Sequence, residues 1–421
     1  MKTVCLTVMI VVFLLCDTNE IQAQTTQTHL NKVIIGSIDS IHSKILNEQR
    51  KIWVYVPNSA SNDTCSKQRY PVVYLLDGDW HFYSVVGMIH QLSSVNGNTI
   101  CPEMIVVGIP NTDRTRDLTP THIDSYLPYM DSSFCKTSGG GENFISFIEK
   151  ELMPYIDSLY PTAPYRMFIG HSFGGLTVMN TLIHHTNLFN AYVVIDPTMY
   201  WDNQKLLREA QKALANSNYS GVSLFLGIAN TMNEGMDTIK VKKDTTKSIF
   251  TIHIRSILEL SNYLINNKQN QLRFAYKYYN NDDHGSVPLI AEYDALHAIF
   301  NYYPLKLSNN DFDTVNKALI SKIENHFENV SKQIGYKINP PEDGVNSLGW
   351  DALNSKHYDE AIYLFKLNVV NYPESSNVYD SLGDYYTAKE DKANAIESYK
   401  KALSIKEVPN TRKKLEKLQG K

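Results

Sequence analysis

Runs of mostly apolar residues without regular alternation most constrain the fold of this 421-residue chain. The runs occupy residues 70–76, 103–109, 165–170, 191–195, 222–227 and 272–278. Strands buried on both faces have this pattern, which is typical of parallel sheets. Helical segments with one apolar stripe, such as residues 144–158, lie between the runs. We therefore predict an α/β domain over about residues 30–305, a mostly parallel sheet with helices on both faces.

The residues after 305 indicate a helical extension. Residues 306–344 contain a helical stretch and then a break at Asn339-Pro340-Pro341, so we predict a helical linker. In residues 345–421 the sequence repeats at a spacing of 34: Leu348-Gly349 recurs as Leu382-Gly383, Ala361 as Ala395, and Phe365 as Tyr399. This pattern resembles the tetratricopeptide repeat. The resemblance implies a protein partner or self-association, and a stabilising appendage is the alternative.

The N-terminus has the three parts of an export signal: Lys2, an apolar run over residues 4–16, and a polar stretch ending at Ala23. We expect residues 1–23 to be removed on export to the periplasm or the cell exterior. A retained anchor, or a lipid on Cys16, is the alternative. No other run approaches the roughly 20 apolar residues of a membrane helix, so we expect no membrane span.

The remaining composition narrows the function classes. A formal net charge of −4 provides no basic field for a nucleic-acid backbone, so we expect no nucleic-acid partner. Cys65, Cys101 and Cys135 remain after the export signal. Either one disulfide forms among them or all three are buried thiols. None has the neighbours of a metal site or of a cysteine nucleophile, and we expect no cofactor and no metal.

The pentapeptide Gly170-His171-Ser172-Phe173-Gly174 is the main candidate for chemistry. It follows the predicted strand 165–170 and precedes a predicted helix over residues 176–184. In that context Gly-x-Ser-x-Gly forms a strained turn that exposes the serine hydroxyl at the edge of the sheet. Ser172 is therefore the predicted nucleophile, and a serine in an ordinary glycine-rich turn is the alternative.

A serine hydroxyl needs a general base at neutral pH, and in this type of site the base comes last in the chain. His284 is the candidate, because it follows the predicted strand 272–278 in a polar loop. His171 is adjacent to the nucleophile in sequence, so its side chain points elsewhere. We expect His171 to pack or to line the substrate pocket.

The acid that orients the histidine is expected in the loop after the strand ending near Gly227. Glu234 is the first choice and Asp237 is the alternative, with Asp244 further along. Asn230 would orient the histidine without stabilising its charged form, and a serine–histidine dyad is a further alternative.

The oxyanion of a tetrahedral intermediate needs preorganised N–H donors. One is the backbone N–H of Phe173. The second is expected in the loop after residues 72–76, where Gly78 permits close approach and the N–H of Asp79 is the donor. The carboxylate of Asp77 either accepts a hydrogen bond from a substrate hydroxyl or braces the turn.

Four segments of the α/β part carry a combination of motifs. They are Tyr74-Leu75-Leu76-Asp77-Gly78 and residues 113–120, 170–175 and 282–288. Together they resemble the putative esterase family of α/β-hydrolases over about residues 35–300, nearest to its siderophore-esterase-like branch. The resemblance implies an α/β-hydrolase fold, with Ser172 and His284 as nucleophile and base and with Phe173 and Asp79 as oxyanion donors. Arg114 and Asp117 are interpreted as braces of their loop.

Residues 195–201 match the place where this family has Ser-Pro-Ser and an aromatic residue that lines the acyl pocket. Asp196 and Thr198 depart from that pattern, and Trp201 stands at the aromatic position. Aromatic side chains are candidates to wall a substrate cleft or to belong to the core: Trp80, Tyr83, Tyr126, Tyr129 and Trp201.

Two functional hypotheses follow. The first is a secreted serine carboxylic-ester hydrolase that forms an acyl-enzyme with a small-molecule or oligosaccharide ester. Its substrates would be feruloyl or acetyl esters of polysaccharides, or siderophore esters. The second is an inactive hydrolase scaffold that binds a protein through the helical repeats.

Overall fold

The computed structural model describes residues 33–61, 68–125, 132–243, 251–308, 311 and 316–420. The predicted export signal, Cys65, Tyr126 and Tyr129 lie outside these residues. The chain divides into two compact units, Met1–Ile34 and Ile35–Lys421, and the second contains all the elements that follow.

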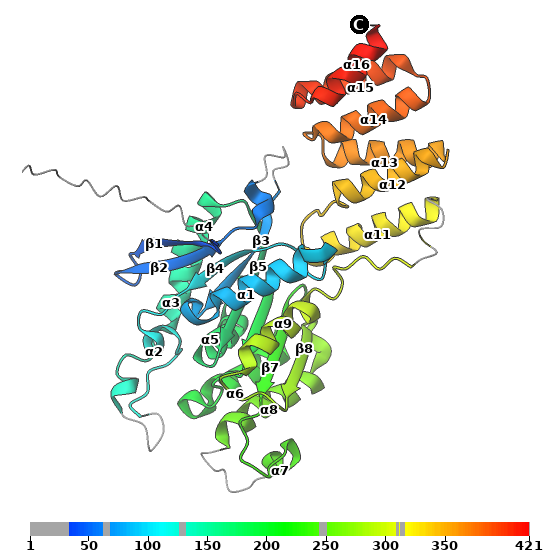
Figure 1. Cartoon of the computed structure of the whole chain (residues 1–421). Coiled ribbons are helices and arrows are strands. Elements are labelled where there is room, and N and C mark those ends of the chain that lie inside the picture. Colours follow the sequence, from blue (N-terminus) through cyan, green and yellow to red (C-terminus); the bar gives the residue numbers. More distant parts are fainter. Residues whose placement is uncertain are drawn as a thin grey trace, which may run out of the picture. The chain divides into compact units, whose positions relative to one another are not determined.

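Eight strands form one sheet within the described residues (Figure 1). They are β1 (Ser37–Ser43), β2 (Glu48–Tyr55), β3 (Tyr70–Leu76), β4 (Ile105–Ile109), β5 (Thr162–His171), β6 (Ala191–Ile195), β7 (Ser223–Ala229) and β8 (Arg273–Tyr279). Their order is β1-β2-β4-β3-β5-β6-β7-β8. β2 is antiparallel to β1 and β4, and every other neighbouring pair is parallel. Each of the six apolar runs forms a strand, so the prediction of a mostly parallel sheet is confirmed.

Helices cover both faces of the sheet (Figure 1). Those of the sheet domain are α1 (Gly78–Ser93), α2 (Arg114–Asp117), α3 (Gly141–Phe147), α4 (Met153–Leu159), α5 (Phe173–His184), α6 (Trp201–Asn216), α7 (Thr238–Lys243), α8 (Ile252–Asn266) and α9 (Val287–Ile299). The helix predicted over residues 144–158 is α3 and α4, joined by one wider π turn over Ile148–Leu152.

Successive strand residues face opposite sides of the sheet and build two cores. In β3, Tyr74 belongs to the core that contains residues of α3, α5, α6 and α8. The adjacent Leu75 belongs to the core that contains residues of α1 and α9. Because both faces are covered, every residue of β3 is buried, which explains why its sequence shows no polar alternation.

The carboxyl ends of the parallel strands meet at one edge of the sheet. β3 and β6 lie on either side of β5, with Leu75 opposite Ile169 and Ile195 opposite His171. The residues that directly follow these three strands are therefore close in space, as is usual for the functional edge of an open α/β sheet. Ser172 is one of them.

Within the described residues, six further helices with assigned bounds lie beyond the sheet domain, from yellow to red in Figure 1. They are α11 (Lys317–Ile334), α12 (Glu342–Asn354), α13 (Tyr358–Asn371), α14 (Ser376–Ala388), α15 (Lys392–Ile405) and α16 (Pro409–Gln419). Each bound of α14 and α15 falls 34 residues after the matching bound of α12 and α13. Helices therefore occur where the repeats predict them, and the tetratricopeptide assignment itself stays a prediction.

The repeated glycines make close contacts between paired helices. A Cβ added at Gly349 would lie 2.8 Å from the ring of Phe365, and one at Gly383 would lie 2.5 Å from the ring of Tyr399. The same small-to-large contact thus occurs in both helix pairs. Ile334, at the end of α11, belongs to the same core as residues of α1 and α9. The end of α11 therefore packs against the sheet domain.

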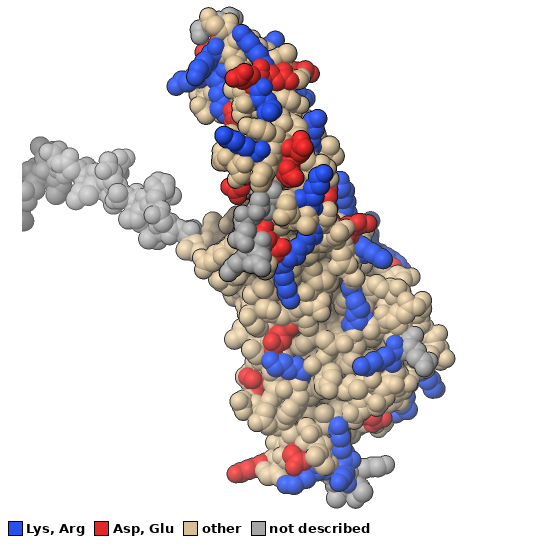
Figure 2. All heavy atoms as spheres, turned by 90° about the vertical axis from the view of Figure 1, so that its right-hand side faces the viewer, with Lys and Arg blue, Asp and Glu red and all other residues tan. Residues whose placement is uncertain are grey.

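Charge and thiol positions complete the description. Basic and acidic side chains are interspersed over the helical extension on the face in Figure 2. Within the described residues, no helix is both long and apolar enough to cross a bilayer. Cys101 and Cys135 are buried free thiols, and burial raises the pKa of Cys101 to about 12.

Candidate active site

Ser172 lies on the turn between β5 and α5, where the motif predicts it. Its backbone has φ 60° and ψ −114°, which a non-glycine residue adopts only when its surroundings impose it. A Cβ added at Gly170 would lie 2.4 Å from the carbonyl carbon of Gly174, so the turn requires glycine there. The strained turn therefore presents Ser172 as a nucleophile elbow does.

Hydrogen bonds tie this turn to the end of β6. The N–H of Ser172 donates to the carbonyl oxygen of Ile195 at 3.0 Å, and the N–H of Thr198 donates to the carbonyl oxygen of Ser172 at 3.1 Å. The Oγ of Ser172 lies 3.4 Å from Oγ1 of Thr198. The residues after β6 are thereby held beside the nucleophile.

His284 lies between β8 and α9 and packs against the residue that precedes the nucleophile. The ring centroids of His284 and His171 are 4.5 Å apart. The Nδ1–H of His284 donates to Oδ2 of Asp196 at 2.6 Å. Because Nδ1 is engaged, Nε2 is the nitrogen that is left to accept a proton from Ser172.

Asp196 directly follows β6, and its side chain is fully buried. Its Oδ1 accepts the N–H of Ala229 at 3.0 Å, and its Oδ2 also accepts Nε2–H of His253 at 2.8 Å. Burial by itself raises the pKa of this carboxyl. The hydrogen bonds from His253 and His284 outweigh burial and hold the pKa of Asp196 well below its usual range. Asp196 is therefore ionised at neutral pH and can stabilise an imidazolium.

Asp196, His253 and His284 are also residue types that bind metal ions. The two nitrogen-to-oxygen distances are 2.6 and 2.8 Å, as in hydrogen bonds. Neighbouring donors around a tetrahedral zinc ion stand about 3.3 Å apart, given bonds of about 2.0–2.1 Å. The cluster therefore fits a hydrogen-bonded triad better than a metal cage.

The structure places Asp196 beside His284, and neither of the two predicted carboxylates. Glu234 is exposed, and Asp237 accepts two backbone N–H groups of its own segment. Within the described residues, neither carboxylate bonds to His284. The amide of Asn230 donates to a backbone carbonyl in the loop before His284, so it fixes that loop. The correction to Asp196 has a topological reason: β6 is the direct neighbour of β5, so a carboxylate at its end reaches the site.

The sequence contained a signal for one of the two missed residues. Asp196 is a carboxylate directly after a buried strand, and it stands where the family has serine. A carboxylate that departs from the family pattern at this position indicates a relocated acid. His253 lies in the first turn of α8 and has no comparable motif.

His171 packs against His284 as an uncharged ring, and its role in the substrate pocket stays a prediction. Burial lowers the pKa of His171 to about 3, and the neighbouring His284 adds to this effect. On its other side, the ring centroid of His81 is 6.0 Å away. Nδ1 of His81 lies 3.5 Å from Oε1 of Glu292, whose pKa burial raises to about 8. At neutral pH His171 carries no charge that would compete with His284.

Each predicted oxyanion donor lies at the start of a helix: Asp79 in the first turn of α1, and Phe173 as the first residue of α5. The first N–H groups of a helix have no acceptor inside it and carry partial positive charge. A Cβ at Gly78 would lie 2.5 Å from the backbone nitrogen of Ile109, so the chain needs glycine there. Because β3 and β5 are adjacent, both helix starts lie at the edge that holds Ser172.

Asp77 is the brace of its loop, the second of the two roles considered. Its carboxylate accepts Nε–H and an Nη2–H of Arg114 at 2.7 and 2.9 Å and the amide of Asn111 at 2.7 Å. These donors engage a carboxylate that is 1% exposed, which favours the bracing role over a hydrogen bond to a substrate hydroxyl. Asp117 likewise binds two arginine side chains. The interpretation of Arg114 and Asp117 as braces is confirmed.

The two tryptophans proposed for the substrate pocket have opposite environments. Trp201 is 1% exposed, lies edge-on to Phe173 at 5.2 Å, and donates Nε1–H to the carbonyl of Thr121 at 3.2 Å. It supports the nucleophile turn from the core, which corrects its proposed role in binding. Trp80 is 62% exposed, and the Arg114 guanidinium lies 5.4 Å from its ring centroid. Trp80 stays a candidate for contact with substrate.

The sheet order, the strained serine turn and the buried Asp196–His284 pair define an α/β-hydrolase. Comparison with known proteins narrows this class. The chain belongs to the putative esterase family, whose profile matches residues 43–255.

Three relatives illustrate the family. The chain is 28% identical over 179 residues to the siderophore enterobactin esterase of Emericella nidulans. The aligned residues cover 40% of this chain and 57% of that protein. It is 29% identical over 195 residues to the ferri-bacillibactin esterase BesA of Bacillus subtilis, which covers 43% and 65%. Both matches span less than two thirds of the relative's length. The crystal structure of an IroE-like serine hydrolase from Shewanella oneidensis superposes with a TM-score of 0.65 at 28% identity, covering 79% of this chain and 98% of that one.

Proposed function

We propose that this protein is an exported carboxylic-ester hydrolase that forms an acyl-enzyme on Ser172. The observation that carries the proposal is the 2.6 Å hydrogen bond between His284 and the buried Asp196, with the His284 ring against the residue preceding Ser172. This bond fixes the tautomer in which Nε2 of His284 is a base. Hydrogen bonds in unliganded sites often shorten when substrate binds. We therefore expect the Ser172 hydroxyl to donate to Nε2 of His284 in the substrate complex.

In the proposed reaction, each residue of the site has one role. Nε2 of His284 takes the Ser172 proton while Oγ attacks the ester carbonyl carbon. Asp196 stabilises the imidazolium, and the N–H groups of Phe173 and Asp79 bind the oxyanion. Collapse of the intermediate breaks the ester bond, and His284 returns the proton to the departing alkoxide. Water, deprotonated by His284, then attacks the carbonyl carbon of the acyl-enzyme. The bond to Oγ of Ser172 breaks, His284 returns the proton to that oxygen, and the carboxylic acid product leaves.

For the substrate we favour a siderophore-type ester over feruloyl or acetyl esters of polysaccharide. The two curated relatives are siderophore esterases by name, and the family membership of this chain supports the transfer. The exposed ring of Trp80 offers a flat apolar surface for an aromatic acyl group. Tyr83, 60% exposed on the same helix, adds a second ring.

Two assays test this proposal. Hydrolysis of p-nitrophenyl acetate by wild type is compared with Ser172→Ala; the proposal fails if wild type is no faster than the variant. Catecholate, feruloyl and acetyl esters are then compared by kcat/KM, and a preference for the acetyl ester would remove the siderophore assignment. For export, the full chain and a form lacking residues 1–23 are expressed and fractionated, and only the full chain should leave the cytoplasm.

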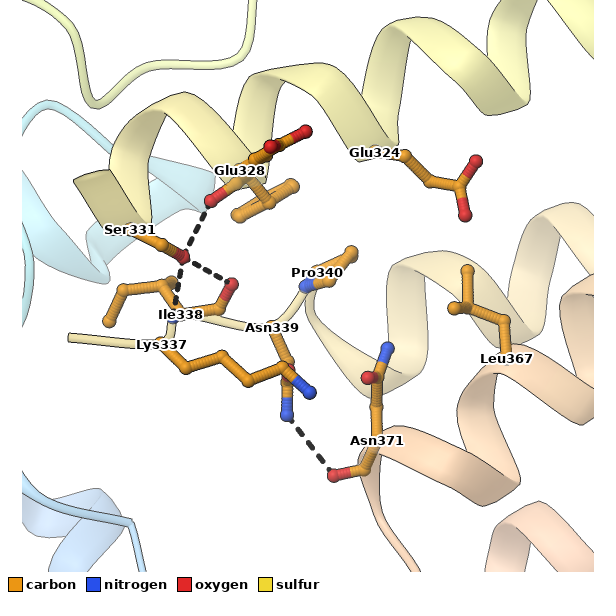
Figure 3. A pocket seen from close by; sticks show the side chains of 10 residues that line it. Glu324, Glu328, Ser331, Lys337, Ile338, Asn339, Pro340, Leu367 and Asn371 are labelled. Atoms are coloured by element: carbon orange, nitrogen blue, oxygen red, sulfur yellow. Dashed lines mark hydrogen bonds between the residues drawn. The ribbon is translucent and has the colours of Figure 1, made fainter. Parts of the chain in front are cut away.

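A second candidate function is protein binding by the helical extension. A cavity of about 280 Å³ lies between α11, the segment after it and α13, away from Ser172 (Figure 3). Its lining mixes apolar, polar and charged side chains and consists of Glu324, Phe327, Glu328, Ser331, Lys337, Ile338, Asn339, Pro340, Leu367 and Asn371. If Ser172→Ala matches wild type in turnover, this cavity is the place to begin a search for a binding role.

A further inference from the structure

One carboxylate oxygen of Asp196 accepts hydrogen bonds from two imidazole rings. Oδ2 accepts Nδ1–H of His284 at 2.6 Å and Nε2–H of His253 at 2.8 Å. A serine–histidine–acid triad needs only the first of these bonds. His253 is thus a titratable side chain in direct contact with the acid for which the proposed mechanism has no use.

The surroundings of His253 hold its ring in this orientation. His253 lies in the first turn of α8, and the hydroxyl of Ser256 donates to its backbone carbonyl at 2.8 Å. Its ring stands edge-on to Tyr200 at 5.5 Å and to His284 at 5.2 Å between centroids. The side chain is 18% exposed. His253 therefore contacts the base, the acid and one further ring.

The protonation states follow from the charge of Asp196. Its pKa is held well below the usual range, so the carboxylate only accepts hydrogen bonds. Each histidine must then present an N–H: Nδ1–H from His284 and Nε2–H from His253. During catalysis His284 becomes a cation, and a second imidazolium at 5.2 Å would oppose that charge. The role of His253 in the reaction accordingly depends on its Nε2–H as a donor to Asp196.

We propose that His253 is a positioning residue that holds the Asp196 carboxylate at Nδ1 of His284 and draws part of its charge, thereby setting the strength of the base. The inference rests on the proposed function. With Oδ1 fixed by Ala229 and Oδ2 by His253, the carboxylate cannot turn away from His284. Misplacement of a catalytic group by about 1 Å costs on the order of 100-fold in rate, so this bond has a measurable effect.

Two amide variants isolate the hydrogen bond from packing. In His253→Gln, the amide nitrogen reaches about as far as Nε2 and donates to Asp196. His253→Asn carries the same amide on a side chain one methylene shorter, so its donor falls short of Oδ2. We expect the glutamine variant to keep kcat within about 3-fold of wild type and the asparagine variant to lose about 10- to 100-fold, with KM changed little in both.

The pH profile provides a readout that a purely structural role would not move. Within the part of the chain that the structure describes, the ionisable groups in contact with the His253 ring are Asp196 and Tyr200 near the end of β6 and His284 after β8. Without the Nε2–H donor, the full charge of Asp196 acts on His284. The acid limb of kcat/KM in His253→Asn should therefore move to higher pH, and in His253→Gln it should stay at the wild-type position.

The experiment measures both variants, wild type and Ser172→Ala on p-nitrophenyl acetate, with thermal melts as a check of folding. Equal kcat values and equal acid limbs for the glutamine and asparagine variants would overturn the role of His253, whether both are active or both are impaired. Wild type no faster than Ser172→Ala would instead refute the proposed esterase function, so the two failures are distinguishable.

Discussion

The exchange of Asp196 for asparagine removes one charge and reverses one hydrogen-bonding group. We expect the asparagine oxygen to stay with the N–H of Ala229, which Oδ1 of Asp196 accepts in the structure. The amide nitrogen then replaces Oδ2 and faces the N–H groups of His253 and His284, donor against donor. His284 must adopt the tautomer with its proton on Nε2, which cannot accept a proton from Ser172.

We expect Asp196→Asn to lower kcat on p-nitrophenyl acetate by about 10⁴-fold, the loss that follows when a triad acid is replaced by its amide. This factor corresponds to about 5.5 kcal/mol of transition-state stabilisation. The residual rate should come from the oxyanion donors, which the exchange leaves in place. Thermal melts accompany the assay, because the side chain is fully buried.

Glu234→Gln and Asp237→Asn are the matched controls, since each removes one carboxylate from the loop after β7. Both should keep kcat within about 2-fold of wild type, as expected for exposed side chains that do not contact the reacting groups. The reasoning is refuted if a folded Asp196→Asn keeps more than a tenth of the wild-type kcat, or if either control loses more than 100-fold.

Three further predictions concern other parts of the site. Burial raises the pKa of Glu292 to about 8, so between its ordinary value near 4.5 and about pH 8 the folded chain keeps a proton that the unfolded chain has released. Stability on the order of 5 kcal/mol should be lost as pH rises across this window, and Glu292→Gln should flatten the curve of Tm against pH between about 5 and 8. Gly170→Ala places a Cβ 2.4 Å from the backbone of Gly174, and we expect at least a 100-fold loss of kcat, with unchanged activity as the contrary result. Trp80→Ala removes the exposed ring and should raise KM for aromatic acyl esters several-fold; an equal change for p-nitrophenyl acetate would show that the ring does not select the acyl group.

The fold was accessible from the sequence because burial on both faces leaves a strong local pattern. Every residue of β3 and β6 is buried, so these strands appear as unbroken apolar runs. The serine turn was accessible for a similar reason, since Gly170 is required by its contact with the backbone of Gly174, within the same five residues of chain. The apolar strands and the serine turn could therefore be predicted from short segments of the sequence.

The acid and the substrate wall depend instead on contacts between distant segments. Asp196 and His284 are 88 residues apart and meet only because the sheet places β6 beside β5. The loop after β7 contains the carboxylates of Glu234 and Asp237, and nothing in its sequence shows that these two face solvent. Asp244 lies outside the described residues. Trp201 has the residue type of a pocket wall, but its contact with Phe173 places it inside the core. Side-chain direction at these positions is a tertiary property.

The position of Asp196 has a consequence for how this protein can change over generations. Because the acid comes from the end of β6, the described residues 230–243 after β7 supply no side chain that bonds to His284 or Ser172. Selection for ester hydrolysis therefore acts weakly on residues 230–243. Asn230 is the exception, because its side-chain amide donates to the loop that contains His284. A lineage can vary its length and composition, and with them access for new substrates, without passing through an inactive ancestor.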